Sequence, residues 1–397
     1  MADVASRAFD TVYRAATEQV RAGDLDSAER EVLRLLDQVE DEATRLRTLG
    51  LLAAVYTRAG RMFESLAIAR YLAVQAHAGK KPRAEFTSLS MACTSLYGLY
   101  INADRRDLLA RMDELLAEIP TDEHAGCHLD HAYCHLGQAL DDDDMPEARR
   151  HLQRLKELAP HASEVDRELA TCARLANEAI VELHEGDPDR ALEVLDELDR
   201  RGVAEPHHAP ELTVLRVRAQ VARGALEDAR DAAAFATEAL EGAPAIALSE
   251  CILYGAGLAE VLDLDLNDPA GALHVYDITA TAVVRRILQL DESLRRLQDL
   301  RIGDTCEKEL VRYRLAFRKG QRRLLDRVGV VLRAQAGGGT QEVLDRATEN
   351  GLIPICAWCE SVRTEGGNWM PFGQYLPRDG SYLITSTICP PCRAELL

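Results

Sequence analysis

Aromatic residues and long apolar runs are scarce in this chain of 397 residues. Phe, Trp and Tyr make up only 5% of it, whereas Ala, Leu, Arg, Glu and Asp dominate. This composition favours helices and excludes an all-β fold. The sequence holds no run of about 18 apolar residues, the length needed to cross a bilayer, and its start lacks the charged-then-apolar layout of a signal peptide. We therefore expect a helical, cytoplasmic protein that is not inserted in a membrane.

Cysteines are too sparse for a disulfide scaffold, with ten in the chain. Four of them form two close pairs near the C-terminus and are treated below. The other six are scattered through helical sequence, and we expect them to be small buried apolar residues. They are Cys93, Cys127, Cys134, Cys172, Cys251 and Cys306.

Basic residues are in the minority, because 47 Lys and Arg face 66 Asp and Glu, for a net charge of −19. Most of the surface should therefore repel phosphate backbones. The charge is uneven along the chain. Residues 1–284 carry 29 basic and 52 acidic side chains, residues 285–333 carry 14 and 7, and residues 334–397 carry 4 and 7. The sequence thus divides into three parts before any motif is considered.

A turn followed by an amphipathic helix recurs seven times in residues 1–284, at steps of 37 to 43 residues. Five of the seven turns have an alanine five residues later, where a small side chain would let the second helix of a pair approach the first. The turn residues are Gly23, Gly60, Ala103, Asp143, Gly186, Gly224 and Asn267, and the alanines are Ala28, Ala148, Ala191, Ala229 and Ala272.

Several fragments match the signature of a known repeat family. Tyr133, Leu136, Gly137 and Leu140 fit the pattern of its first helix, the spacing of Gly98 and Ala110 fits its Gly-to-Ala step, and Pro160 fits the proline that ends a unit. The segment resembles the tetratricopeptide repeat, although its units of about 40 residues exceed the usual 34 or so. The resemblance implies an all-α fold, a tetratricopeptide-like α-solenoid.

Stacked helix pairs curve and present an extended concave surface on which peptides or partner domains dock. We therefore expect protein partners, and the acidic array favours a partner with a basic segment. The alternative is that the array only holds its two ends apart.

A histidine cluster lies inside the array. His124, Cys127, His128, His131, Cys134 and His135 occur within twelve residues, and helical spacing places the four histidines along one stripe. Histidines at i and i+4 can share a metal ion, and a pH-sensing role is also open. A single helix presents its ligands in a row, however, whereas a tetrahedral site needs ligands from two elements. Solvated or core positions are therefore the favoured interpretation.

Residues 285–335 change character, and we predict linker helices there. Ile287, Leu290, Leu294 and Leu297 follow coiled-coil spacing, so a homodimer is one hypothesis. The stretch around Leu294–Leu300 and Glu307–Glu309 resembles the linker of bacterial proteins that join tetratricopeptide repeats to an output domain. Residues 312–327 then hold seven cations against one anion. They could pair with the acidic array, dock an acidic partner or contact phosphates, and the first two are favoured.

The strongest chemical signal lies in residues 351–397, after a predicted flexible break and short helix over residues 336–350. Cys356 and Cys359, then Cys389 and Cys392, form two Cys-x2-Cys pairs. Such turns deliver thiolates to a tetrahedral Zn²⁺ ion, and four of them leave no position open for water. We therefore predict a structural zinc in a treble-clef or ribbon-like module, with a β-hairpin through residues 368–385. A redox dithiol is the less favoured alternative.

The tail also resembles a four-cysteine segment at the C-terminus of some bacterial sensor kinases and response regulators. The shared residues are Ile355, Cys356, Ala357, Cys359, Val362, Arg363, Glu365, Gly367, Trp369, Ile388, Cys389, Pro390 and Cys392. No phosphate loop, nucleophile elbow or kinase signature occurs in the sequence. We expect a non-catalytic signalling adaptor with no catalytic residues. The alternative is a regulator that binds nucleic acid through residues 312–327 and the zinc module.

Overall fold

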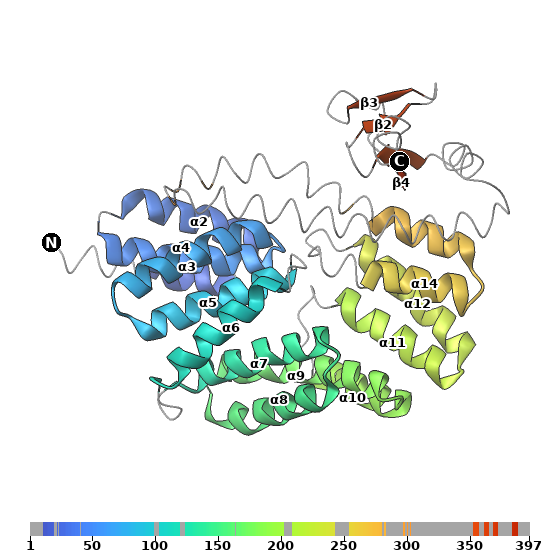
Figure 1. Ribbon diagram of the computed structural model, residues 1–397, viewed down its shortest axis with the longest axis horizontal. Coiled ribbons are helices and arrows are strands. Elements are labelled where there is room, and N and C mark those ends of the chain that lie inside the picture. Colours follow the sequence, from blue (N-terminus) through green and yellow to red (C-terminus); the bar gives the residue numbers. More distant parts are fainter. Residues whose placement is uncertain are drawn as a thin grey trace, which may run out of the picture. The chain divides into compact units, whose positions relative to one another are not determined.

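The computed structural model shows that the chain is built mainly of helical hairpins (Figure 1). The residues that it describes are 11–19, 22, 24–39, 41–98, 103–119, 124–162, 164–201, 209–242, 254–279, 282, 297, 300, 302, 352–356, 361–364, 368–371 and 383–387. The chain forms two compact units, one made of residues 1–207 and 291–313 and the other of residues 208–290 and 314–397.

The first unit contains a helix over residues 11–19 and nine longer α-helices among its described residues. They are α2 (Leu25–Gln38), α3 (Glu42–Arg58), α4 (Met62–Ala78), α5 (Pro82–Gly98), α6 (Ala103–Leu116), α7 (Ala125–Asp141), α8 (Met145–Leu158), α9 (Glu164–His184) and α10 (Pro188–Arg201), with a short 3-10 turn, η1 (Ala159–His161), after α8. Each helix packs against the next, and α3, α5, α7 and α9 also contact one another in series. This pattern is that of an α-solenoid, as the sequence predicted.

The second unit holds α11 (Ala209–Arg223), α12 (Leu226–Glu241), α14 (Ala256–Leu264) and a helix over residues 269–279. Val217, Ala233, Leu258 and Val275, one from each of these helices, are buried in one apolar core. The same turn-and-helix rhythm therefore continues here, as the repeat spacing predicted.

The turns inside the hairpins have a common geometry. Gly60, Asp143, Gly186, Gly224 and Asn267 all have positive φ angles, between 51° and 82°. Such a residue ends a helix because it lets the next backbone N–H bond back to the last turn; the N–H of Arg61, for example, donates to the carbonyl of Tyr56 at 2.8 Å. Ala103 differs from the prediction, since it is the first residue of α6. Gly23 lies outside the described residues.

The small residue after each turn is the second common feature. Ala28, Ala148, Ala191, Ala229 and Ala272 are all 0% exposed, as the predicted close approach of the two helices requires. In α4 the position belongs to Ser65, also 0% exposed. Its hydroxyl bonds to Thr57 on α3 and to Ser95 on α5, at 2.7 and 3.0 Å.

Little of the predicted linker lies among the described residues. Leu297, which coiled-coil spacing places on the dimer seam, is 0% exposed within the single chain. Nearby, the Arg45 guanidinium on α3 donates to the carbonyl of Leu300 at 2.6 Å. This bond ties Leu300 to the solenoid, and the homodimer stays a prediction. The cations of residues 312–327 and the short helix of residues 336–350 lie outside the described residues.

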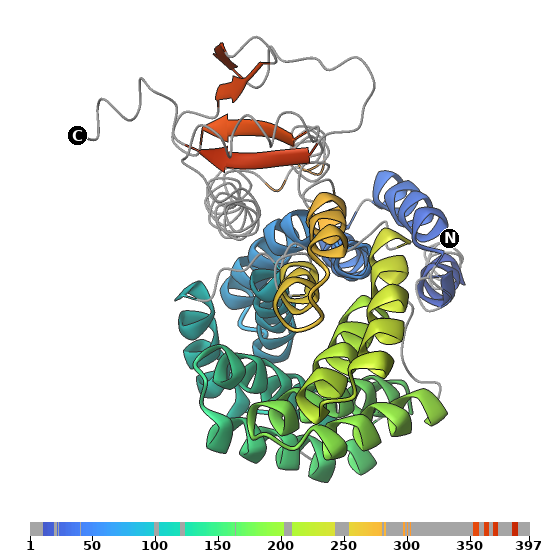
Figure 2. The same ribbon diagram turned by 90° about the vertical axis from the view of Figure 1, so that its right-hand side faces the viewer.

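The C-terminal residues form a four-stranded sheet in the order β3-β2-β1-β4. Its strands are β1 (Leu352–Cys356), β2 (Ser361–Arg363), β3 (Trp369–Pro371) and β4 (Leu383–Thr387). β1 pairs antiparallel with β2 and parallel with β4, and Figure 2 shows β1 and β4 as arrows that point the same way. The predicted hairpin through residues 368–385 is wrong, because β3 and β4 lie at opposite edges. The short β1–β2 and β2–β3 connections form the local hairpins instead.

None of the helices in the described part of the chain is both long and apolar enough to span a bilayer.

The alanine after the turn can be tested with two alanines on α12. Ala229 is 0% exposed, whereas Ala234 is exposed. We expect Ala229→Leu to lower the free energy of unfolding by about 1–3 kcal/mol, because extra methylenes overpack the hairpin. Ala234→Leu should change it by no more than about 0.5 kcal/mol. Urea unfolding followed by circular dichroism measures both, and equal effects of the two substitutions would contradict the packing role.

Candidate functional site

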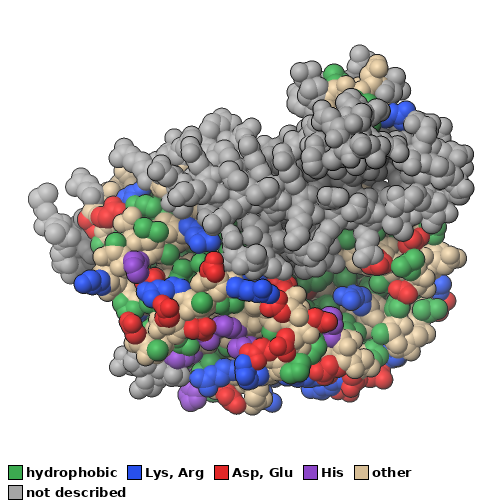
Figure 3. Space-filling view, in the orientation of Figure 1, with side chains coloured by type: hydrophobic (Ala, Val, Ile, Leu, Met, Phe, Trp, Pro, Cys, Tyr) green, Lys and Arg blue, Asp and Glu red, His purple; other side chains and the backbone are tan. Residues whose placement is uncertain are grey.

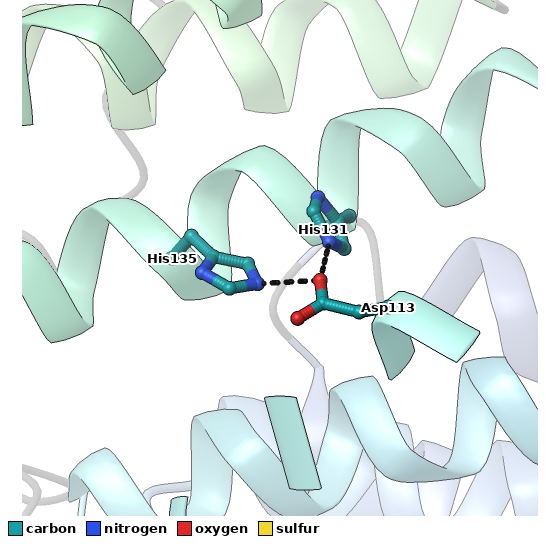
Figure 4. Close-up of side chains that lie close together, drawn as sticks. All are labelled: Asp113, His131 and His135. Atoms are coloured by element: carbon teal, nitrogen blue, oxygen red, sulfur yellow. Dashed lines mark hydrogen bonds and ion pairs between the residues drawn. The ribbon is translucent and has the colours of Figure 1, made fainter. Parts of the chain in front are cut away.

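The histidine cluster meets an aspartate from the preceding helix. His131 and His135 lie one turn apart on α7 and both point toward Asp113 on α6 (Figure 4). Nε2 of His131 lies 2.6 Å from Oδ1 of Asp113, and Nε2 of His135 lies 3.1 Å from the same oxygen. The three groups can each offer one ligand atom, and these atoms all lie within 4.8 Å of one another. The cluster therefore brings two elements together, which the sequence did not indicate.

A third helix packs against the same cluster. The ring of His151, on α8, stacks on that of His135, with centroids 5.2 Å apart and planes 19° apart. Nε2 of His151 lies 2.8 Å from a carboxylate oxygen of Glu147, one turn earlier on α8. Figure 3 shows histidine side chains gathered over α6 and α7 among acidic and basic ones. Contacts from both sides thus hold the imidazole of His135 in place.

The cluster is half-buried and open on the side of the aspartate. The side chains of His131 and His135 are 19% and 22% exposed, and that of Asp113 is 53% exposed. Burial lowers the pKa of His131, although the bond to Asp113 acts in the opposite direction. Burial likewise lowers the pKa of His151. Since the ordinary histidine pKa is 6.5, both imidazoles are neutral at neutral pH.

The other two histidines of the predicted stripe play different parts. His128 is 8% exposed, and its Nε2 lies 3.0 Å from the carbonyl oxygen of Ile119, so it is a hydrogen-bonded core residue. His124 precedes α7 at the N-cap position, and its side chain makes no capping bond. Two of the four histidines therefore form the cluster. A core position, which the sequence favoured, describes His128.

Arginines near the start of α6 and α8 hold successive hairpins together. Arg105 on α6 bonds to Gln138 and Asp141 on α7, 33 and 36 residues later, at 3.3 and 2.6 Å. Arg149 on α8 repeats the pattern with Glu182 on α9 and Glu185 just after it, also 33 and 36 residues later. The side chain of Arg105 is only 2% exposed. These bonds fix how the second helix of one hairpin lies on the first helix of the next hairpin. Those of Arg105 place α6 beside α7 in this way.

A further ion pair ties α6 back to α5. Arg111, two residues before Asp113, bonds through Nε to the carboxylate of Glu85 at 2.8 Å, and the side chain of Glu85 is 8% exposed. The helix α6, which carries Asp113, is thus anchored on both α5 and α7.

The predicted zinc ligands are only partly among the described residues. Cys356 ends β1, and its backbone pairs with that of Thr387, the last residue of β4. Because β1 and β4 are parallel, the two strands end at the same side of the sheet, β1 at Cys356 and β4 at Thr387. In the sequence, Cys389 follows Thr387 by two residues. Cys359, Cys389 and Cys392 lie outside the described residues.

Four of the six scattered cysteines are buried, as predicted: Cys93, Cys127, Cys134 and Cys172. Cys134 contacts the hydroxyl of Ser90 on α5 at 3.9 Å, and a hydrogen bond with Cys93 together with burial raises its pKa. It is therefore an unreactive packing residue. Cys251 and Cys306 lie outside the described residues.

A pocket of about 710 Å³ lies in the second unit, between α12, α14 and the helix of residues 269–279. Its walls mix apolar side chains with a few polar ones. The polar members include Arg230, Asn267 and His274. They offer no pairing of a nucleophile with a base among the bonds of the described residues, so we assign the pocket no chemistry.

Sequence reasoning missed Asp113 and His151 as members of the histidine cluster. Asp113 precedes His131 by 18 residues, and His151 follows His135 by 16. The repeat register could have found them, because it places α6 and α8 on either side of α7. It could not have selected these side chains over the other polar residues of the two helices.

Neighbouring arginines on α6 test the anchor that places Asp113. Arg105 and Arg106 pair with neighbouring aspartates at the end of α7, Asp141 and the C-cap residue Asp142, but the side chain of Arg106 is 66% exposed. We expect Arg105→Ala to lower the free energy of unfolding by about 3–5 kcal/mol, because it leaves a half-buried carboxylate unpaired. Arg106→Ala should cost no more than about 1 kcal/mol. Denaturant unfolding measures both, and similar losses would show that Arg105 is not an anchor.

No family model matches the chain. The curated proteins likewise contain no match. Among solved structures, the chain is similar to a Rap protein in complex with competence and sporulation factor, at 11% sequence identity and a TM-score of 0.42. The similarity covers 80% of this chain and 99% of that one. A likeness this weak supports no statement about function, and the solenoid assignment depends on the helix contacts described above.

Proposed function

We propose that the protein is a non-catalytic adaptor that binds a partner protein along the row formed by α3, α5, α7 and α9. The series of contacts between these helices is the observation that carries the proposal. In stacked helical hairpins such a row forms a continuous surface wide enough for a peptide or a partner helix. The role of a signalling adaptor rests on the sequence resemblances alone.

The central helix of the row offers a defined contact point. Asp130 and Tyr133 lie three residues apart on α7, hence on one face, and both are exposed. Tyr133 is 36% exposed, an unusual fraction for a large apolar side chain in this chain. An amphipathic aromatic ring beside a carboxylate suits a partner segment that carries both apolar and basic residues.

The excess of acidic residues in the array favours the same kind of partner. Residues 1–284 carry 52 acidic and 29 basic side chains. Complementary charge mainly raises the association rate and selects against acidic competitors. A basic segment is therefore the partner chemistry that we propose.

The C-terminal sheet would provide a second docking surface, held together by a structural Zn²⁺ on Cys356, Cys359, Cys389 and Cys392. The parallel pairing of β1 and β4 supports this, since both strands end at one side of the sheet and each is followed, or ended, by a cysteine pair in the sequence. Neighbouring strands lie about 4.8 Å apart, so two tight turns that follow them need little chain to converge. Four thiolates fit structural zinc and leave no open position for catalysis.

Loss of the contact point on α7 should release the partner. We expect Tyr133→Ala combined with Asp130→Asn to abolish co-purification of a specific protein with the tagged full-length chain at high salt. Val74→Ala is the matched control, because Val74 is 62% exposed on α4, outside the row. Affinity capture with mass spectrometry compares the three proteins. Equal capture by all of them would contradict docking on α7. If instead the protein is retained on heparin, with an affinity that falls steeply as the salt concentration rises, the alternative of nucleic-acid binding is favoured.

Cysteine substitution tests the zinc module. We expect a mercurial thiol reagent to release about one zinc per chain from the purified protein. Cys389→Ser should remove that zinc, while far-ultraviolet circular dichroism retains its helical signal, because the four cysteines follow the solenoid helices in the sequence. Elemental analysis and a colorimetric zinc assay make the measurement. A chain without thiol-released zinc would refute the assignment.

A further inference from the structure

We infer that Asp113, His131 and His135 form a second metal site, which binds a divalent transition-metal ion of the Zn²⁺ type. It is separate from the cysteine module in both residues and ligand chemistry. Two imidazoles and one carboxylate form a donor set that Zn²⁺ and its neighbours accept. The site uses α6 and α7, so its ligands converge from two elements.

The distances suit such an ion. Ligand atoms about 2.1 Å from a tetrahedral Zn²⁺ lie about 3.4 Å from one another. In the structure the two imidazole nitrogens lie 2.6 and 3.1 Å from Oδ1 of Asp113, and all three atoms fall within 4.8 Å of one another. Small side-chain rotations are therefore enough to seat an ion, because Nε2 of both histidines already points at Oδ1 of Asp113 (Figure 4).

The surroundings prepare the ligands for a metal. The stacked ring of His151 holds His135 in position, and Arg105 and Arg111 hold α6 on its neighbours. Such supporting contacts orient metal ligands and preserve their geometry. The 53% exposure of Asp113 leaves a path for the ion.

A metal ion at this site would link two helices and keep one coordination position free. Three protein ligands leave the fourth position to water or to a side chain of another molecule. A bound ion would join α6 to α7 directly and so stabilise the solenoid. Binding to the folded state alone raises the unfolding temperature as the metal concentration increases.

Cobalt(II) titration of the full-length protein tests the inference. We expect the wild-type chain to bind one Co²⁺ whose visible spectrum lacks the sulfur-to-cobalt charge-transfer band, in addition to any Co²⁺ on the four cysteines, which would show that band. Asp113→Asn should weaken this binding by more than the roughly 10–100-fold that loss of an outer-shell partner costs. His131→Gln combined with His135→Gln should abolish it. Zn²⁺ should raise the unfolding temperature of the wild type and should not raise that of the double variant.

His274→Gln is the matched control. His274 lies 2.8 Å from the carboxylate of Glu241 and is 54% exposed, so it is a histidine–carboxylate pair without a third ligand. Its loss should leave the cobalt binding unchanged. Circular dichroism of each variant confirms that the chain is folded. The inference is overturned if the folded wild type shows no saturable binding of Co²⁺ or Zn²⁺ at micromolar concentration, or if the histidine double variant binds Co²⁺ as the wild type does.

Discussion

The distance between the two helices of each hairpin depends on one small side chain, and the rest of the solenoid follows from it. Ala148 and Ala191 are 0% exposed at the point where α8 and α10 begin to pack on α7 and α9. Close approach there brings the larger residues of both helices into one core, in which Leu136 of α7 meets Leu152 and Leu155 of α8. The left-handed turn residues and the close contact together give the hairpins that have them similar geometry, so these hairpins can stack in series.

Electrostatic contacts then set the relation between successive hairpins. Arg105 and Arg149 reach residues 33 and 36 positions later, so the same arrangement recurs from one repeat to the next. Buried pairs of this kind are costly to break and depend on accurate geometry. The same geometry carries Asp113 to the imidazoles of α7, which links the candidate metal site to the repeat architecture.

Features that depend on the spacing of residues close together in the sequence were predictable. The turn residues, the alanines behind them and the four buried cysteines of the array follow from helical periodicity and side-chain size. All but Ala103 are as expected where the structure describes them. Contacts between residues far apart in sequence were not predictable. The bond between Asp113 and His131 depends on how α6 packs against α7. The pairing of β1 with β4 joins two strands that β2 and β3 separate in the sequence. The zinc ligands stay a prediction, supported by strand register.

The parallel pairing of β1 with β4 also imposes an order on folding during protein synthesis. A hairpin of the solenoid finds its partner within about 40 residues, so such hairpins can form while the chain emerges from the ribosome. The strand β1 must wait for β4, which begins only at Leu383, after β2 and β3 have been made. Until then it has an unpaired edge that can recruit other strands. The solenoid can therefore be folded while β1 is still open to aggregation, and this exposure ends only when β4 pairs with it.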